Sequence, residues 1–276
     1  MFDHNFENLN KHDLYIKSKQ VSSPKEKIKC LERITEIDSD DAYAWHQLGN
    51  LFASFNEIKS KHCWNISIQK YKGRIEMFKD DAQKFQKDPS HLHQMDIESS
   101  DVIYEIGKRF FCLGQVYENL KQYSLAVNAF KKAFEIKPTA TNCLYYIGKS
   151  LYSDEKYEES EQYLLQFAKK HESYQVHFLL GSIYWKTDYV DDALTEFWKC
   201  IETAGNDSES DYYRYMSYYN LRNLKKAEQY LEKSIEKDPN DLTMIYELIT
   251  HYEENNEPKK AYRYYEMVKS KRDEFP

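Results

Sequence analysis

Apolar positions along the chain follow a period of about 34 residues that contains two helical stripes. Gly114, Gly148 and Gly181 stand 34 and 33 residues apart, and two more steps of 34 reach Tyr215 and Ile249. The residues three, twelve and sixteen places after these anchors are Tyr117, Ala126 and Phe130; Leu151, Ser160 and Leu164; Tyr184, Ala193 and Phe197; Tyr218, Ala227 and Leu231; and Tyr252, Ala261 and Tyr265. Within each unit the apolar residues recur at three- and four-residue intervals, so each unit predicts two amphipathic helices.

Small residues and prolines mark where the two helices cross and where a unit ends. Glycine at one crossing and alanine at the other allow two antiparallel helices to approach closely. Pro138 and Pro239 each follow an anchor by 24 residues, and proline cannot continue a helix. The pattern therefore predicts an all-α chain of repeated antiparallel helix pairs, with a boundary after each second helix.

The repeat resembles the tetratricopeptide repeat family. The match is fullest in Leu113, Gly114, Tyr117, Ala126, Phe130, Ala133 and Pro138, and it covers about residues 107–275. The resemblance implies a right-handed α-solenoid, in which stacked helix pairs form a superhelix. Two kinds of departure occur. Asp211 and His177 stand where a large apolar residue is usual, and Tyr215 and Ile249 replace the small anchor, so we expect less regular packing there.

We expect residues 1–276 to form a single solenoid. Its regular units are 107–140, 141–173, 174–207, 208–241 and 242–275. A further unit, 42–106, begins with Ala42, Trp45, Leu48, Gly49 and Phe52 and carries an insertion with a long helix. Residues 8–41 form a degenerate first unit, whose apolar face consists of Leu14, Ile28, Leu31 and Ile34.

The segment 57–106 departs from the period, because Gly49 and Gly114 are 65 residues apart, about 31 more than one unit. Its apolar residues alternate four- and three-residue steps through Trp64, Ile68, Tyr71, Ile75, Phe78, Ala82 and Phe85. This stripe favours a long helix over about 61–87, ended by Asp88-Pro89-Ser90 and followed by a polar loop over 91–99. The alternative is a cryptic extra repeat. The stripe can pack against neighbouring units, or it can belong to a protruding helix that recruits a partner.

The first helix of each pair lines the concave side of such a stack. The resemblance implies that positions three before, one after and four after the anchor point into this groove. The predicted partner-binding groove consists of His46, Asn50, Phe111, Gln115, Tyr145, Lys149, Tyr152, Phe178, Trp185, Tyr212, Tyr219 and Tyr246. Its aromatic rings can anchor a partner, because they bury large areas with few rotatable bonds. The alternative is that rings of neighbouring units stack on one another and only fill a narrow superhelix.

The groove lacks the residues with which some tetratricopeptide proteins hold the C-terminal carboxylate of heat-shock chaperones. Such a site needs Lys and Asn on one repeat, Asn on the next, and Lys with Arg on the third. Asn50 is present, but its partner position holds His46 and the next repeat offers Cys112. The third repeat offers Asn142 and Tyr146. We therefore expect a different protein partner. The asparagine ladder with which sugar-transfer enzymes bind peptide backbones is also missing.

Composition and charge narrow the function classes further. The chain has 39 Lys and Arg against 46 Asp and Glu, a net charge of −7, and no region basic enough for strong phosphate binding. It lacks an apolar run of about 18 residues, so we expect no membrane partner. Five scattered cysteines without a Cys-x-x-Cys pair, and an N-terminus without a signal pattern, indicate a reduced, cytoplasmic protein.

The sequence shows no catalytic constellation and no cofactor or metal site. Its seven glycines form neither a phosphate loop nor a dinucleotide-binding motif. His91 and His93 have no further ligands to complete a metal site. His62 and Cys63 are neighbours on a helix and would face different directions.

These observations favour a non-enzymatic adaptor or scaffold that holds a peptide or short helix of a partner protein in its aromatic groove. Lys149, His46 and Gln115 would fix the polarity and register of that ligand. The region 141–207, with 6 Lys and Arg against 12 Asp and Glu, suits a partner with basic and apolar residues. Two alternatives stay open: a self-associating structural subunit of a larger assembly, and a helical repeat protein that binds single-stranded RNA.

Overall fold

The computed structural model of the protein describes the backbone of residues 9–87 and 99–273. Within these ranges the chain forms fourteen α-helices and no strand, which confirms the all-α prediction. The helices are α1 (Lys11–Gln20), α2 (Pro24–Ile37), α3 (Ala42–Phe52), α4 (Glu57–Lys87), α5 (Ser99–Asn119), α6 (Tyr123–Ile136), α7 (Asn142–Ser153), α8 (Tyr157–Ala168), α9 (Tyr174–Lys186), α10 (Val190–Thr203), α11 (Ser208–Asn220), α12 (Leu224–Lys237), α13 (Leu242–Glu254) and α14 (Pro258–Asp273).

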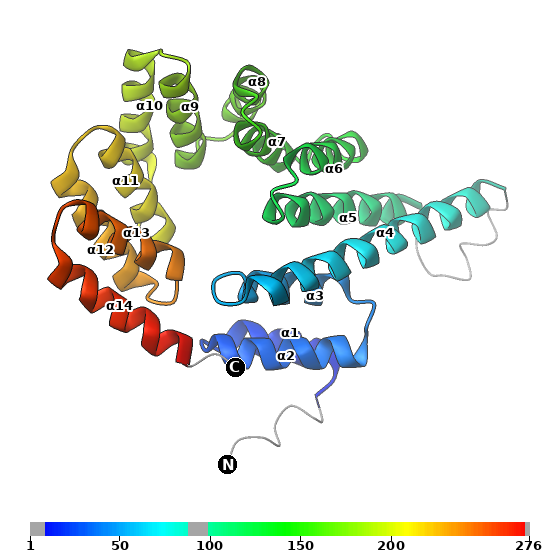
Figure 1. Ribbon diagram of the computed structural model, residues 1–276. Helices are drawn as coiled ribbons and strands as arrows, with labels where there is room; N and C mark the ends of the chain where they lie inside the picture. Colours follow the sequence, from blue (N-terminus) through cyan, green and yellow to red (C-terminus); the bar gives the residue numbers. More distant parts are fainter. Residues whose placement is uncertain (1–8, 88–98, 274–276) are drawn as a thin grey trace. The chain divides into compact units, whose positions relative to one another are not determined.

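The chain divides into two compact parts, Met1–Ser150 and Leu151–Pro276, called here the N-terminal half and the C-terminal half. The division falls within α7. In the N-terminal half the packed pairs are α1 with α2, α3 with α4, and α5 with α6 (Figure 1). In the C-terminal half they are α9 with α10, α11 with α12, and α13 with α14. Each half therefore consists of helix pairs that follow one another along the chain.

The turn inside a helix pair recurs with the period of the sequence. Lys121, Glu155, Asp188, Arg222 and Asn256 all adopt a left-handed conformation, with φ between 57° and 69°. The N–H of the next residue donates to the carbonyl five residues before it. For example, Gln122 N–H donates to the Tyr117 carbonyl (2.8 Å). This bond closes the first helix in the manner of a Schellman motif, which allows the short return into the second helix.

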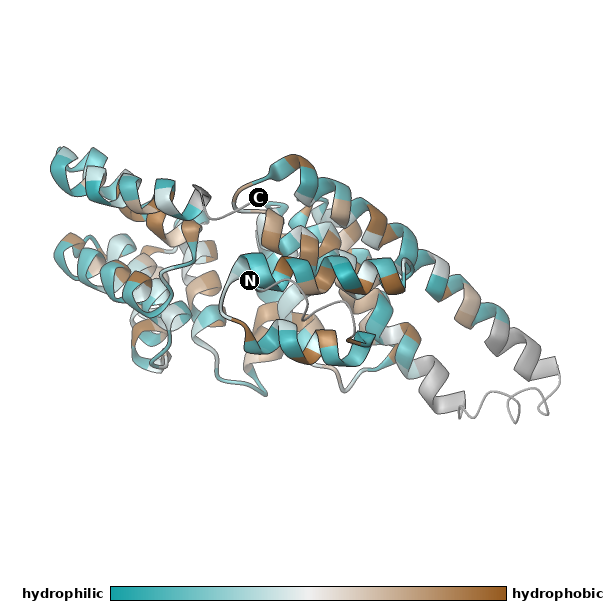
Figure 2. Ribbon diagram, turned by 90° about the horizontal axis from the view of Figure 1, so that it is seen from below, coloured by the Kyte–Doolittle hydropathy of each residue, from teal (hydrophilic) through white to brown (hydrophobic). Residues whose placement is uncertain are grey.

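Close helix crossings explain the small residues at the anchors. A Cβ atom on Gly114 would lie 2.6 Å from the ring of Phe130, and one on Gly181 would lie 2.9 Å from the ring of Phe197. Both rings are fully buried. The apolar residues run as stripes along individual helices (Figure 2). The anchor glycine is thus required where an aromatic ring of the second helix packs on the backbone of the first.

The long helix α4 uses its apolar stripe for packing. Trp64, Ile68, Tyr71 and Ile75 are at most 8% exposed, and α4 packs against α3 and α5. The described part of the stripe therefore belongs to the core rather than to a free docking surface. Ala82 and Phe85 have no described side chains, and the expected helix end at 88–90 and the loop at 91–99 lie outside the described residues except for Ser99.

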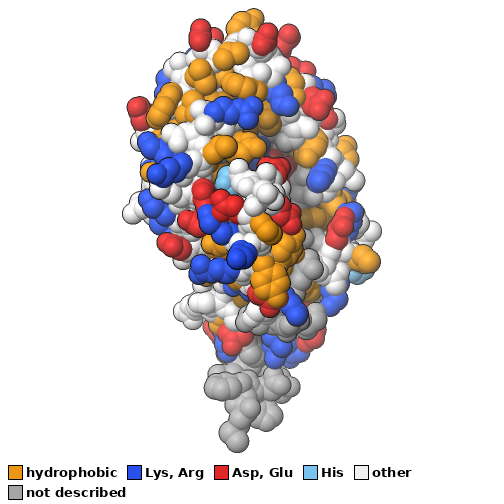
Figure 3. Space-filling view, turned by 60° about the vertical axis from the view of Figure 1, so that its left-hand side comes forward, with side chains coloured by type: hydrophobic (Ala, Val, Ile, Leu, Met, Phe, Trp, Pro, Cys, Tyr) orange, Lys and Arg blue, Asp and Glu red, His pale blue; other side chains and the backbone are white. Residues whose placement is uncertain are grey.

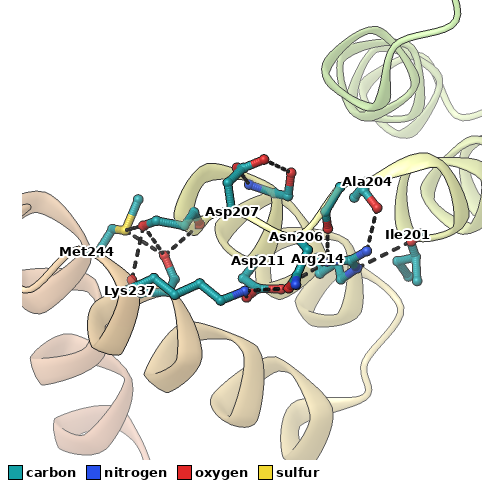
Figure 4. Close-up of polar contacts among 12 residues, drawn as sticks. Ile201, Ala204, Asn206, Asp207, Asp211, Arg214, Lys237 and Met244 are labelled. Carbon is teal, nitrogen blue, oxygen red and sulfur yellow. Dashed lines mark hydrogen bonds and ion pairs between the residues drawn. The ribbon is translucent and has the colours of Figure 1, made fainter.

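Asp211 sits at a position where an apolar residue is usual, and a polar cluster compensates for it (Figure 4). Its carboxylate is buried and accepts hydrogen bonds from Arg214 (2.9 Å) and from Lys237. The Arg214 guanidinium also donates to the carbonyl oxygens of Ala204 and Gly205, just after α10. The cluster therefore joins α11, α12 and the end of α10 through polar contacts.

His177 is the second polar residue at an apolar position, and it too is paired. Its Nδ1 lies 2.6 Å from a carboxylate oxygen of Glu196 on α10. Burial alone would raise the pKa of Glu196, but hydrogen bonds from His177 and Lys199 outweigh it and lower that pKa. In both places, a polar contact between two helices stands where an apolar residue was expected.

Candidate functional site

The groove residues predicted in the N-terminal half are partly engaged with one another. Phe111 packs edge-on against Tyr146 of α7, with ring centroids 5.1 Å apart, and Tyr145 packs edge-on against Tyr146. Lys149 pairs with Glu118 at 3.3 Å. Gln115 is half-buried on α5. The rings of α5 and α7 therefore stack across successive repeats, which leaves less aromatic area for a ligand.

A polar network holds the groove positions of α3. His46 is 3% exposed, whereas Asn50 is exposed. Asn50 accepts hydrogen bonds from the Trp64 indole (3.0 Å) and from Asn119 (2.8 Å). Burial lowers the pKa of His46 to about 4, so the imidazole is neutral near pH 7. These side chains link α3, α4 and α5, and His46 is positioned for packing rather than for contact with a ligand.

The N-terminal half contains an open cavity of about 530 Å³, called here the cationic cavity. Its lining comes from α3 to α7 and includes Tyr43, Tyr71, Tyr104, Glu105, Lys108, Arg109, Phe111, Cys112, Lys137 and Asn142. Lys108 and Lys137 both lie over the Tyr104 ring, at 4.4 and 4.3 Å from its centroid. Glu105 pairs with Lys108 and Arg109. Two cations thus share the Glu105 carboxylate, and a third, Lys137, lies over the Tyr104 ring.

The C-terminal half brings three of its predicted groove residues together. Phe178 of α9 and Tyr212 and Tyr219 of α11 line one open cavity of about 280 Å³, called here the tyrosine cavity. Its full lining is Phe178, Tyr212, Tyr215, Met216, Tyr219, Asn220, Glu247, Thr250, His251 and Glu254. These residues come from α9, α11 and α13, the first helices of three successive pairs. The cavity therefore lies on the face that the repeat pattern assigns to the groove.

The other three groove residues predicted in this half lie outside the tyrosine cavity. Tyr152 is half-buried beside Tyr157, with ring centroids 5.8 Å apart. Trp185 is 39% exposed, and Tyr246 is half-buried. Phe178 itself packs edge-on against Tyr213 at 5.4 Å. The predicted set therefore divides into rings that line a cavity and rings that stack or stand apart.

The tyrosine cavity is lined by two carboxylates, Glu247 and Glu254, and by no Lys or Arg. Burial is the largest cause that raises the pKa of Tyr212 to about 12, and Glu247 and Asp241 add to it. The pKa of Tyr215 is raised as well, by burial and then by Glu247, with a smaller contribution from Glu254. Both phenols therefore stay neutral at physiological pH, and the charged side chains in the lining are acidic.

Sequence reasoning did not assign Tyr215, Glu247 or Glu254 to the site. Tyr215 occupies an anchor position, and its ring lies beside those of Tyr212 and Tyr219 at centroid distances of 5.7 and 6.2 Å. Glu247 and Glu254 are seven residues apart, which places them on one face of α13. That spacing and the tyrosine at a glycine position were the signals that could have identified them.

No enzymatic or metal chemistry is visible among the described residues. Within them, no group of three or more His, Cys, Asp or Glu side chains is arranged to hold a metal ion. His62 is exposed and Cys63 is buried, so the two face different surroundings. His91 and His93 lie outside the described residues. In the described ranges, no helix combines the length and apolar character that crossing a bilayer requires.

An all-α chain of consecutive helix pairs, with a recurring turn and a recurring small residue at the crossing, is an α-helical repeat protein. The sequence model of the tetratricopeptide repeat family matches residues 111–139, 174–207 and 216–241. These three segments are tetratricopeptide repeats. Proteins of this family are in general non-enzymatic interaction modules, which supports a protein-interaction role in this broad sense.

Several solved structures are similar to this chain. Yeast Tom70 is similar with a TM-score of 0.52 and 14% identity, over 96% of this chain and 61% of that one. MamA from Desulfovibrio magneticus RS-1, residue 41 to the end, has a TM-score of 0.43 and 17% identity, over 70% and 93%. YrrB, a tetratricopeptide protein with an unusual peptide-binding site, has a TM-score of 0.36 and 18% identity, over 78% and 96%. No curated protein matches the chain by sequence.

Proposed function

We propose that the protein is a non-enzymatic adaptor that binds an extended peptide or short helix of a partner protein in the concave groove. The observation that carries this proposal is the tyrosine cavity. Phe178, Tyr212 and Tyr219 from two first helices meet there around an open volume of about 280 Å³. Partly exposed tyrosine rings favour binding, because they can bury apolar area while their hydroxyls keep a polar partner.

The exposure of Tyr219 supports a role in contact with a ligand. Its side chain is 36% exposed, while Tyr215 beside it is 7% exposed. Tyr219 can therefore lose accessible area when a ligand binds, and Tyr215 forms the floor below it. An anchor of this kind at the centre of a contact carries a large share of binding energy.

The proposal is tested with the full chain and a phage-displayed library of random peptides. Peptides selected on the wild type are then measured against Tyr219→Ala and against Tyr262→Ala. Tyr262 is the matched control, because its ring is 65% exposed and does not line the cavity. We expect Tyr219→Ala to weaken binding by about tenfold or more and Tyr262→Ala to leave it unchanged. Equal affinity for the wild type and Tyr219→Ala would contradict the proposal.

Self-association through the stripe of α4 is less well supported. The stripe is buried from Trp64 to Ile75, and the ring of Phe78 lies under Arg109 at 5.5 Å. An apolar face already covered within the chain is not available to a second copy. The net charge of −7 and the absence of a basic segment argue in the same way against RNA.

A further inference from the structure

Two carboxylates at the tyrosine cavity have no ion-pair partner among the residues that the structure describes. Glu247 and Glu254 are both exposed on α13, and neither takes part in an ion pair within the described residues. Other acidic side chains of this half do: Asp211 pairs with Lys237 and Arg214, and Glu228 pairs with Lys260. The two glutamates therefore form an unneutralised acidic edge.

The acidic edge borders aromatic faces. Tyr212, Tyr215 and Tyr219 line the same cavity as the two glutamates, and its lining contains neither Lys nor Arg. The electron-rich face of a tyrosine attracts a cation that lies over it, most strongly where water is partly excluded. Tyrosine rings and carboxylates in the lining of one cavity provide two attractions for the same charge.

The cavity is small enough to define its guest. A volume of about 280 Å³ accommodates one side chain rather than a helix. Met216 and Phe178 provide apolar surface for the methylene groups of a long side chain. Glu247 and Glu254 line the same cavity and are exposed, so they can pair with a charged end. Lysine and arginine combine an apolar stem with a cationic head and match this arrangement.

We propose that the tyrosine cavity binds a lysine or arginine side chain of the partner peptide, with the cationic head between the tyrosine rings and the carboxylates of Glu247 and Glu254. This inference rests on the proposed function and adds the chemical class of the anchoring residue. The pKa of Tyr215 agrees with it, because burial and the field of Glu247 hold the phenol neutral and leave the ring as an uncharged face.

The cationic cavity provides an internal contrast. There Lys108 and Lys137 already lie over Tyr104, and Lys108 and Arg109 already share Glu105. The chain itself thus supplies the cations for that aromatic surface. The lining of the tyrosine cavity also has tyrosine rings and carboxylates, but it contains no Lys or Arg. In the proposed complex the partner peptide supplies the cation.

The test uses n-butylguanidinium as a mimic of the arginine side chain and n-butylurea as its neutral counterpart. The full chain is labelled with ¹³C at its six methionine methyl groups, and Met216→Leu identifies the signal of Met216. We expect n-butylguanidinium to shift that signal saturably and n-butylurea to have little effect. Added salt should weaken the effect, because both carboxylates are exposed.

Charge variants complete the test. In Glu247→Gln/Glu254→Gln we expect the dissociation constant of n-butylguanidinium to rise about tenfold. Glu253→Gln is the matched control, because Glu253 lies on the same helix but bonds Tyr265 and does not line the cavity. Equal responses to the two probes, or an unchanged constant in the double variant, would overturn the inference.

Peptide binding separates this inference from the proposed function. If selected peptides depend on Tyr219 but need no basic residue, the groove function stands and the cationic anchor is wrong. If the peptides do not depend on Tyr219, the proposed function fails. A selected peptide that loses affinity when its arginine is replaced by citrulline, and loses less in the double glutamine variant, supports both.

Discussion

His46 shows how one buried side chain makes stability depend on pH. Its pKa is lowered to about 4 because burial disfavours the imidazolium ion, whereas histidine in an unfolded chain titrates near 6.5. The folded state therefore binds the proton more weakly. The stability from this residue is complete above about pH 6.5 and is lost as the pH falls towards 4, by up to roughly 3 kcal/mol.

Urea unfolding of the full chain at pH 7 and pH 4.5 measures this effect against His46→Gln. Glutamine has no proton to gain and can still accept the contact from Asn119, which lies 3.4 Å from the His46 ring. We therefore expect the wild type to lose more stability than the variant over this interval. The carboxylates that titrate in both proteins cancel in the comparison, and the same pH dependence in both would contradict the assignment.

Asp211 is the buried charge on which its repeat depends most. Removing it in Asp211→Ala leaves Arg214 and Lys237 without their shared counter-charge, although Arg214 keeps its carbonyl partners after α10. We expect the variant to lose about 3 kcal/mol of unfolding free energy. Asp211→Asn should lose less, because the amide oxygen can still accept from Arg214. Thermal unfolding that leaves both variants at the wild-type midpoint would show that the cluster contributes nothing net.

The residues at the site show how far the repeat and its resemblance can predict a site. The resemblance to tetratricopeptide repeats implies that Phe178, Tyr212 and Tyr219 are groove residues, and all three line one cavity. The resemblance did not select Glu247 or Glu254, because they stand next to the expected groove positions on α13 and not at them. In a helix of 3.6 residues per turn, a residue next to a groove position can also reach the cavity. Which neighbours reach the cavity depends on the rotation of α13 against α11, a property of packing.

At the scale of a helix pair, the close crossing of α5 and α6 should tolerate no side chain at its anchor. Gly114→Ala would place a Cβ 2.6 Å from the buried ring of Phe130. We expect a loss of about 1–3 kcal/mol from overpacking. Gly73→Ala is the matched control in the exposed middle of α4, where a Cβ meets no atom within 4 Å. It should gain roughly 1 kcal/mol from helix propensity, and urea unfolding of the two variants should therefore give opposite signs.

The elements themselves were largely predictable, and their ends were less so. The stripe that starts at Trp64 indicates a helix from about residue 61, whereas α4 begins at Glu57. The first turn of α4 has few apolar residues, and its Ile58 is exposed and not part of the apolar stripe. Apolar periodicity therefore could not locate the first residue of α4. The polar pairs Asp211–Lys237 and His177–Glu196 were also beyond a pattern of apolar residues, because each joins two helices through polar side chains.

At the scale of the whole molecule, the contacts between helices follow the order of the repeats. Acidic, basic and hydrophobic side chains are interspersed on the face shown in Figure 3. Within each half, the packed helices are neighbours in sequence or first helices of adjacent pairs, such as α9 and α11. A chain with this contact pattern has a stability that is a sum of repeat and nearest-neighbour terms. A local change should therefore spread only to adjacent helix pairs.

Hydrogen exchange followed by mass spectrometry can test this locality with Asp211→Ala. The polar cluster joins α11 and α12 to the end of α10, and α12 packs on α13. We expect faster exchange in α10 to α13, because opening free energies there fall with the lost ion pairs. Peptides from α1 to α3 should exchange at the wild-type rate. Gly114→Ala tests the same idea in the N-terminal half. There we expect faster exchange in α5, in α6 and in α4, which packs on α5. Uniformly faster exchange in both variants would mean that the chain opens as one cooperative body, and nearest-neighbour coupling would then be the wrong description.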